Sequence, residues 1–148
     1  MAAANDMIVK KIMTKKIVFV GVDDTLGVVK DIFDNVAFHH LLVLEHGRIF
    51  GIVSDRDLFK AISPNLGTNV ETMKDVATLN KKVHHIMSRN PVVVSEDASV
   101  FEAIELFNNN DISCIPVVDN EQRPVGIVSW RDILRAVGER KAVRNGQE

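Results

Sequence analysis

The chain contains two copies of one sequence pattern, and this duplication constrains its fold more than any other feature. The segment Val9-Lys-Lys-Ile-Met-Thr14 recurs as Val83-His-His-Ile-Met-Ser88, a spacing of 74 residues that the next apolar positions keep. After one inserted residue, Gly51-Ile-Val-Ser-Asp-Arg-Asp57 recurs as Gly126-Ile-Val-Ser-Trp-Arg-Asp132, with six of seven positions identical. A fixed spacing of this kind indicates two copies of one structural unit. We call this last segment the closing motif.

Each copy has the same expected order of elements: strand, helix, strand, strand, helix. In the first copy, the β-branched run 17–22 predicts a strand, and apolar residues at helical spacing predict a helix over 26–36. Two short apolar runs on either side of Gly47 predict a hairpin, and Ser54 or Asp55 is expected to cap a last helix. In the second copy, strands are expected at 92–94, 115–118 and 125–128, and helices at 100–107 and 132–137.

These patterns predict an α/β (α+β) fold of two βαββα repeats, packed through their sheets with an approximate two-fold axis. The expected boundaries are residues 7–62 for the first repeat, 63–82 for a linker, 83–138 for the second repeat and 139–148 for a polar tail. The linker is expected to hold a short helix over 70–79, and the tail is expected to be frayed at the chain end.

Composition excludes several classes of protein. The chain has 148 residues, 46% of them hydrophobic, and a net charge of -2, which predicts a globular protein without a nucleic-acid partner. No apolar run is long enough for a membrane span or a signal peptide, so we expect a cytoplasmic location without membrane insertion. The single cysteine, Cys114, excludes an internal disulfide and is expected to be a small buried residue.

The closing motif is the strongest chemical signal. It brings a hydroxyl, a guanidinium and a carboxylate to the junction of a strand and a helix, where free N–H groups favour an anion. Arginine can bind phosphate in a bidentate manner, and a carboxylate can accept both hydroxyls of a ribose. The alternative is helix capping, with Ser54 and Ser129 as caps and Asp57 and Asp132 in the first turn. The repetition of the motif favours a nucleoside-phosphate function.

No catalytic constellation is recognisable in the sequence, so the chain is expected not to be an enzyme. It has no Gly-x-Ser-x-Gly elbow, no Gly-rich phosphate loop, no His-Glu-x-x-His and no cysteine cluster. The pairs His39-His40 and His84-His85 could suggest a metal, but adjacent residues point to different faces and chelate poorly. We therefore expect no metal site and no catalytic cofactor.

With both copies laid out, the chain resembles a tandem pair of CBS domains, also called a Bateman module. The resemblance rests on Ile12-Met13-Thr14, Ile86-Met87-Ser88, Cys114-Ile-Pro-Val-Val-Asp119 and the two closing motifs, and it covers about residues 9–137. It implies two βαββα units that meet through their sheets and often dimerise. It also implies binding of adenine nucleotides (AMP, ADP or ATP) or S-adenosylmethionine, which is signalled to an enzyme, channel or transporter.

The resemblance implies two ligand clefts, each with residues from both repeats. The closing-motif carboxylate would hold the ribose, and the other repeat would supply an early hydroxyl and strand backbone for the adenine. The first cleft would join Ser54, Arg56 and Asp57 with Ser88, Val92, Ile112, Ser113 and Cys114. The second would join Ser129, Arg131 and Asp132 with Thr14, Val18, Phe38, His39 and His40.

The two copies differ at positions that bear on binding. His39 and His40 are bulkier than their equivalents Ser113 and Cys114, which could crowd the second cleft. Asp55 adds negative charge near the first cleft and should weaken binding of several phosphates, so a monophosphate is favoured there. Trp130, at the position equivalent to Asp55, is predicted either to stack on a base or to cover a dimer surface.

The sequence therefore predicts a stand-alone regulatory module, expected to be a homodimer. It would sense an adenine nucleotide or related adenosyl ligand and act on a partner protein that the sequence does not identify. The alternative is a dimerisation or interaction scaffold with vestigial clefts.

Overall fold

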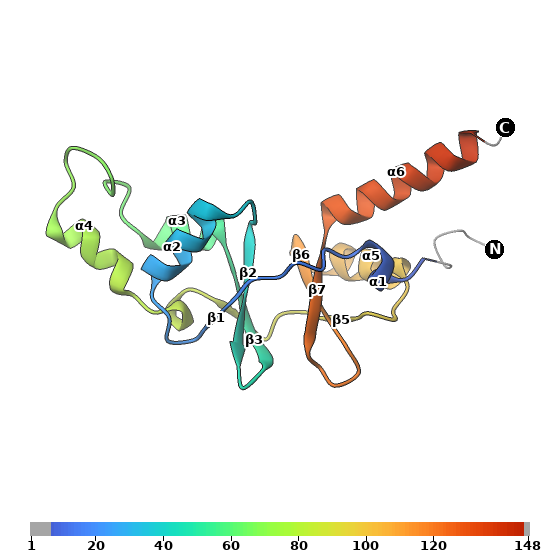
Figure 1. The fold of residues 1–148 in the computed structure, drawn as a ribbon, viewed down its shortest axis with the longest axis horizontal. Helices are drawn as coiled ribbons and strands as arrows, with labels where there is room; N and C mark the ends of the chain where they lie inside the picture. The colour runs from blue at the N-terminus through green and yellow to red at the C-terminus, as the bar shows by residue number, and fades with distance from the viewer. Residues whose placement is uncertain (1–6, 147–148) are drawn as a thin grey trace. The chain divides into compact units, whose positions relative to one another are not determined.

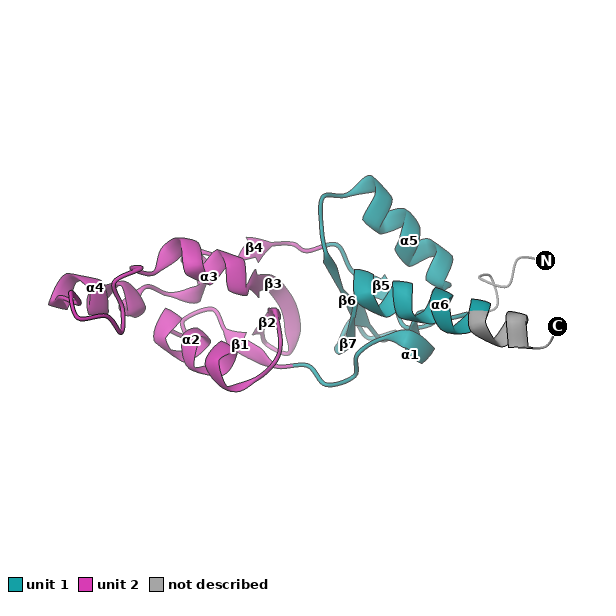
Figure 2. Ribbon diagram, turned by 90° about the horizontal axis from the view of Figure 1, so that it is seen from above, with its two compact units in different colours: residues 1–17, 92–148 teal, residues 18–91 magenta. Residues whose placement is uncertain are grey.

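The structure is a computed structural model that describes residues 7–146, with side chains described as far as Lys141. The chain divides into two compact units, which Figure 2 shows in different colours. Unit 1 comprises Met1–Ile17 and Val92–Glu148, and unit 2 comprises Val18–Pro91.

Unit 2 holds a four-stranded sheet in the order β1-β2-β3-β4. Strand β1 pairs parallel with β2, while β2 pairs antiparallel with β3 and β3 antiparallel with β4. Helices α2 and α3 cover one face of this sheet (Figure 1). The elements are β1 (Phe19–Gly21), α2 (Leu26–Asn35), β2 (His40–Glu45), β3 (Arg48–Ser54), α3 (Asp55–Ala61), α4 (Met73–Ala77), the 3-10 turns Thr78–Asn80 and Val83–His85, and β4 (Ser88–Arg89).

Unit 1 repeats this arrangement with a three-stranded sheet in the order β5-β6-β7. The first pair is again parallel and the second antiparallel. The elements are α1 (Val9–Ile12), β5 (Val94–Ser95), α5 (Val100–Asn109), β6 (Cys114–Val118), β7 (Pro124–Ser129) and α6 (Trp130–Gly146). Both units thus contain the predicted order βαββα, which confirms the α/β (α+β) class with two repeats.

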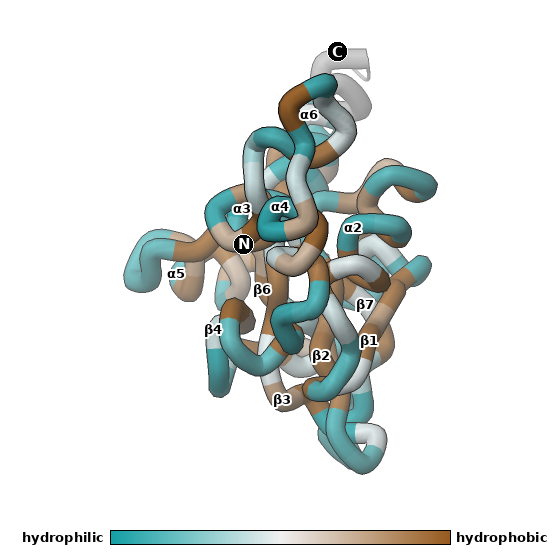
Figure 3. The backbone as a smooth tube through the Cα atoms, turned by 90° about the vertical axis from the view of Figure 1, so that its left-hand side faces the viewer, coloured by the Kyte–Doolittle hydropathy of each residue, from teal (hydrophilic) through white to brown (hydrophobic). Residues whose placement is uncertain are grey.

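Each unit has its own apolar core beneath its helices. In unit 2 the core joins Leu26 and Val29 of α2 with Leu58 of α3 and the inward side chains of β2 and β3. In unit 1 it joins Ala103 of α5 and Ile133 of α6 with β6 and β7. Figure 3 shows the corresponding hydrophobic stretches along the strands. Burial of these stripes against a sheet is the main favourable contribution to each fold.

Local signals in the sequence explain where the elements begin. The hydroxyls of Thr25, Ser54 and Ser99 accept hydrogen bonds from backbone N–H groups in the first turns of α2, α3 and α5. The β2–β3 turn places His46 and Gly47 at φ angles of 54° and 76°. Left-handed residues of this kind suit the twist of a two-residue hairpin loop, and glycine adopts them without steric cost.

Several predicted boundaries are wrong, and strand β1 begins at Phe19 rather than at residue 17. Strand β5 begins at Val94 rather than at residue 92. The linker helix begins at Met73, because Thr72 and Asp75 form a capping box there. Helix α6 continues to Gly146 instead of ending at Val137, so most of the expected frayed tail is helical. The residues just after Val137 are mostly good helix formers (Glu139, Arg140 and Lys141), which favours this extension.

The compact units do not coincide with the sequence repeats, because the two repeats exchange their first segments. We call these the opening segments, residues 9–14 in the first repeat and 83–88 in the second. The backbone N–H of Val9 donates to the carbonyl of Ala98 at 2.8 Å, which ties the opening of the first repeat into unit 1. The N–H of Val83 donates to the carbonyl of Asp24 at 2.8 Å, which ties the opening of the second repeat into unit 2. Each unit is therefore completed by a segment from the other repeat.

Candidate functional site

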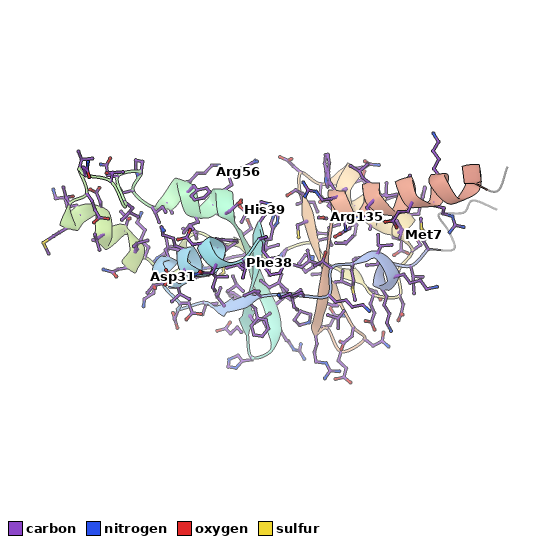
Figure 4. All side chains as sticks on the ribbon, turned by 45° about the horizontal axis from the view of Figure 1, so that its top comes forward. Met7, Asp31, Phe38, His39, Arg56 and Arg135 are labelled. Atoms are coloured by element: carbon purple, nitrogen blue, oxygen red, sulfur yellow. The ribbon has the colours of Figure 1, made fainter. Side chains whose placement is uncertain are left out.

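In unit 2 the closing motif forms the junction of β3 and α3. The Ser54 hydroxyl accepts from the Asp57 backbone N–H at 3.0 Å, and the Asp57 carboxylate accepts from the Ser54 N–H at 2.9 Å. This reciprocal pair is a capping box, so the capping role weighed from the sequence is confirmed. Arg56 is exposed and makes no ion pair among the described residues. Figure 4 labels Arg56 on α3 and His39 just before β2.

In unit 1 the second closing motif forms the junction of β7 and α6. The Asp132 carboxylate accepts from the Ser129 N–H at 2.9 Å and from the Ser129 hydroxyl at 3.2 Å. Asp132 is only 7% exposed and is the one buried charged residue of the described part of the chain. Arg131, like Arg56, points to solvent.

The exchanged opening segments lie directly against the closing motifs. In unit 1, Thr14 and Ile127 exchange two backbone hydrogen bonds of 2.8 and 2.9 Å. In unit 2, Ser88 is paired with Ile52 in the same antiparallel manner. The two repeated sequence signals, Ile-Met-Ser/Thr and Gly-Ile-Val-Ser, are therefore the two sides of one strand contact.

The glycine of each closing motif is required by this contact. A Cβ atom at Gly126 would lie 2.6 Å from Sδ of Met13 and 2.9 Å from the carbonyl oxygen of Thr14. A Cβ atom at Gly51 would lie 2.8 Å from Sδ of Met87 and 2.9 Å from a backbone oxygen. Any larger residue would push the opening segment away from the closing motif, and at Gly126 this would also move the Thr14 hydroxyl away from Asp132.

The contact places a hydroxyl against only one of the two carboxylates. The Thr14 hydroxyl donates to both oxygens of Asp132, at 3.3 Å and 3.4 Å. Ser88, the equivalent of Thr14, is exposed and makes no side-chain hydrogen bond to Asp57 in the described structure. Asp57 is half-buried and keeps one carboxylate oxygen, Oδ1, without a bonded donor among the described residues.

The variable residue of each closing motif, Asp55 or Trp130, contacts a residue just before the neighbouring strand of its sheet. In unit 2, Oδ2 of Asp55 lies 2.8 Å from Nδ1 of His39. In unit 1, the indole N–H of Trp130 donates to the carbonyl oxygen of Ile112 at 3.2 Å, and its ring meets Phe107 edge-on. The sequence analysis missed both contacts, although the equivalence of positions 55 and 130 was the available signal.

In each unit, an ionisable side chain lies on the neighbouring strand opposite the serine of the closing motif. His40 faces Ser54 across β2 and β3, and Cys114 faces Ser129 across β6 and β7. Burial lowers the pKa of His40, although Asp55 and Asp57 partly oppose this shift. Burial, together with the negative charge of Asp132, raises the pKa of Cys114 to about 12. Cys114 is buried as the sequence predicted, and both side chains are uncharged at neutral pH.

Each predicted cleft contains residues from both units. The residues of one unit are therefore described together, and those of the other unit follow. In unit 2 the structure brings Ser54 and Asp57 together with His40, and places Ser88 on the neighbouring strand. In unit 1 it brings Asp132 together with Thr14 and Cys114. The other predicted residues lie on the strands or loops next to these motifs: Val18 and Phe38 in unit 2, and Val92, Ile112 and Ser113 in unit 1.

Within the described residues, no three His, Cys, Asp or Glu side chains are grouped as a metal site would require. His84 and His85 stack on each other, with ring centroids 4.2 Å apart. In the same part of the chain, no helix is long and apolar enough to cross a membrane.

Two βαββα repeats that exchange their opening segments, each with a strand-to-helix Ser-x-Arg-Asp motif, define a class of paired, duplicated domains. The CBS domain model matches residues 9–64 and 83–139, and the chain belongs to this family. The expected resemblance to a tandem CBS pair is thereby confirmed.

Similar proteins agree with this assignment. A CBS domain-containing protein of Dictyostelium discoideum is 34% identical over 130 residues, which are 86% of this chain and 89% of that protein. The CBS domain pair of protein MJ0100, solved with 5'-methylthioadenosine and S-adenosyl-L-methionine, is 28% identical with a TM-score of 0.72, covering 90% of this chain and 98% of the other. The cytosolic domain of the Mg2+ channel MgtE, solved with ATP, is 29% identical with a TM-score of 0.66, covering 84% and 46%.

Proposed function

We propose that this CBS pair is a non-catalytic regulatory module that binds an adenosine-containing ligand and signals its presence to a partner protein. The observation that carries the proposal is the Asp57 carboxylate, which the Ser54 N–H holds at the start of α3 while one of its oxygens has no bonded donor. A carboxylate fixed in this way accepts hydrogen bonds from the two adjacent hydroxyls of a ribose.

The ligand class is suggested by the proteins that this chain resembles. The MJ0100 pair was solved with two adenosyl compounds and the MgtE domain with ATP. These ligands share adenosine and differ in everything attached to its 5' carbon. The proposal for this chain is therefore recognition of adenosine, with AMP, ADP, ATP and S-adenosylmethionine as the candidates.

We assign the ribose and the 5' substituent to the closing motif. Asp57 would accept from the ribose, Ser54 would remain the helix cap, and the exposed Arg56 would be free to meet a phosphate. The remaining contacts are those predicted from the resemblance. They are Ser88, Val92, Ile112, Ser113 and Cys114 for the cleft of Asp57, and Ser129, Arg131, Asp132, Thr14, Val18, Phe38, His39 and His40 for the cleft of Asp132.

Signalling would follow from a shift of population. A ligand that contacts residues of both repeats favours the arrangement of the repeats in which all those contacts form together. The shift that it produces equals the difference of its affinities for the two arrangements, and a partner that senses one arrangement reads out that difference.

A second candidate function, assembly as a homodimer, is favoured by the outer face of α6. Trp130, Leu134 and Val137 are 58%, 69% and 47% exposed, and their spacing of four and three residues places them on one side of the helix. An exposed apolar stripe of this kind is typical of a surface that a second protein covers. The scaffold function needs only this face, whereas the sensor function also needs the carboxylate.

Calorimetric titration of the full chain, freed of ligand by reversible unfolding, tests the proposal. We expect saturable micromolar binding of at least one of AMP, ADP, ATP and S-adenosylmethionine. Asp57→Asn, which removes the charge, should weaken binding by about 10- to 100-fold, as expected for hydrogen bonds to a charged group. The control is Asp31→Asn on α2, an exposed carboxylate labelled in Figure 4, which should bind as the parent does. If no binding heat is measured up to millimolar ligand and the chain forms a stable dimer, the scaffold function is supported and the sensor function is contradicted.

A further inference from the structure

The two closing-motif carboxylates occupy the same position of a motif that is identical at six of seven residues, but they have different hydrogen-bond partners. Asp132 receives the Ser129 N–H, the Ser129 hydroxyl and the Thr14 hydroxyl, and it is 7% exposed. Asp57 receives one backbone N–H, from Ser54, and is half-buried. A carboxylate offers about four lone-pair positions, so donors already bound at Asp132 leave little for a diol.

We infer that the carboxylates divide into one open and one closed site: Asp57 takes the ribose of the ligand, whereas the Thr14 hydroxyl already occupies Asp132, so each chain binds one adenosine ligand. This inference rests on the proposed function. It assigns a specificity-determining role to Thr14, a residue that the family resemblance places among the ligand contacts.

The Thr14 hydroxyl is held against Asp132 by the backbone. Its main chain exchanges two hydrogen bonds with Ile127, two residues before Ser129, and this pairing fixes where the side chain can reach. The hydroxyl then lies 3.3 Å from Oδ1 and 3.4 Å from Oδ2, so a ribose that approaches either oxygen must displace it. A ribose hydroxyl would then replace the Thr14 hydroxyl on the carboxylate, and the bond that Thr14 loses offsets part of the free energy gained by binding the ribose.

Ser88 has the same backbone position but a different side chain. It pairs with Ile52 as Thr14 pairs with Ile127, so backbone placement does not explain the difference. Threonine carries a second heavy atom on Cβ, which restricts its χ1 rotamers, whereas serine rotates more freely. The methyl group of Thr14 is therefore one chemical difference between the two sites, and it lies on the residue that contacts Asp132.

The stoichiometry of binding to the full chain tests this inference, with the tightest-binding compound of the adenosine series as the probe. We expect one ligand per chain for the parent. In Thr14→Val, which keeps the shape but removes the hydroxyl, we expect a second ligand within about tenfold of the affinity of the first. Adding Asp132→Asn to Thr14→Val should remove that second ligand. The control Thr68→Val, in the linker, should keep one ligand per chain.

The reverse exchange keeps the inference testable if Thr14→Val unfolds. Ser88→Thr should close Asp57 and weaken the single ligand by about tenfold or more while the melting temperature is unchanged. Two equivalent ligands on the parent, or one ligand on folded Thr14→Val, would overturn the inference and leave the proposed function intact. Absence of any binding to the parent would overturn both.

Discussion

Oδ2 of Asp55 lies 2.8 Å from Nδ1 of His39, and this contact occupies the place that the Trp130–Ile112 hydrogen bond has in the other repeat. In both repeats, the side chain at the variable position of the closing motif contacts a residue just before the neighbouring strand, which is β2 in unit 2 and β6 in unit 1. The two contacts differ in charge, because the first repeat has a carboxylate at the position where the second repeat has an indole. The first motif consequently carries a negative charge that the second lacks.

That charge predicts a preference among ligands. Asp55→Asn should raise the affinity for ATP about fivefold relative to adenosine, since removing one charge near a polyphosphate changes the interaction by about 1 kcal/mol at a hydrated surface. The measurement is calorimetry with both ligands in the same buffer. His39→Gln, which retains the Asp55 charge, is the matched control. Equal gains for ATP and adenosine would show that the charge is not the cause.

The close approach at the motif glycines predicts a loss of stability on adding one methyl group. Gly51→Ala and Gly126→Ala should each lower the free energy of unfolding by about 1–3 kcal/mol, because the Cβ meets a backbone oxygen that cannot move aside. Gly138→Ala is the control, since nothing lies within 4 Å of its Cβ position and α6 should gain roughly 0.5–1 kcal/mol. Urea titration measures all three. Unchanged stability of both motif variants would contradict the contact.

Burial of His40 predicts a dependence of stability on pH. Its pKa is lowered in the folded chain, so the unfolded chain binds the proton more readily and stability falls as pH drops below the ordinary value of 6.5. His40→Cys, which introduces the residue of the equivalent position, should flatten the change in melting temperature between pH 7 and pH 5. His85→Gln, at an exposed histidine, should retain the parent profile. An identical slope in His40→Cys and the parent would refute this role.

The environment of Cys114 predicts an unreactive thiol. Burial and Asp132 raise its pKa to about 12, so almost no thiolate forms at pH 8, and the thiolate is the reactive species. Iodoacetamide should modify the native chain far more slowly than the chain unfolded in urea, as measured by mass spectrometry. Comparable rates in the two states would mean that the thiol is accessible and ionisable.

Much of the fold could be predicted from local patterns. The strands, the hairpin at Gly47 and the cap at Ser54 each follow from residues close together in the sequence. The end of α6 was predicted too early, because the apolar spacing stops at Val137 while the polar helix formers that follow, Glu139 to Lys141, continue the helix. Local patterns also do not indicate with which repeat an opening segment packs, so the exchange of opening segments between the repeats could not be predicted from them.

The candidate site was predictable in its residue types but not in its connections. The repeated Ser-x-Arg-Asp motif identified Asp57 and Asp132 as equivalent carboxylates. The hydrogen bond from Thr14 to Asp132 joins residues 118 positions apart and depends on the pairing of two strands. It distinguishes two sites that the sequence presents as a pair.

The most direct measurement is a titration of the isotope-labelled full chain with AMP, followed through backbone amide resonances. The account predicts saturable shifts that are largest at the amides of Ser54, Arg56 and Asp57, with smaller shifts at the equivalent amides of Ser129, Arg131 and Asp132. Saturable binding that leaves the first closing motif unshifted, or that shifts both motifs equally, would contradict it.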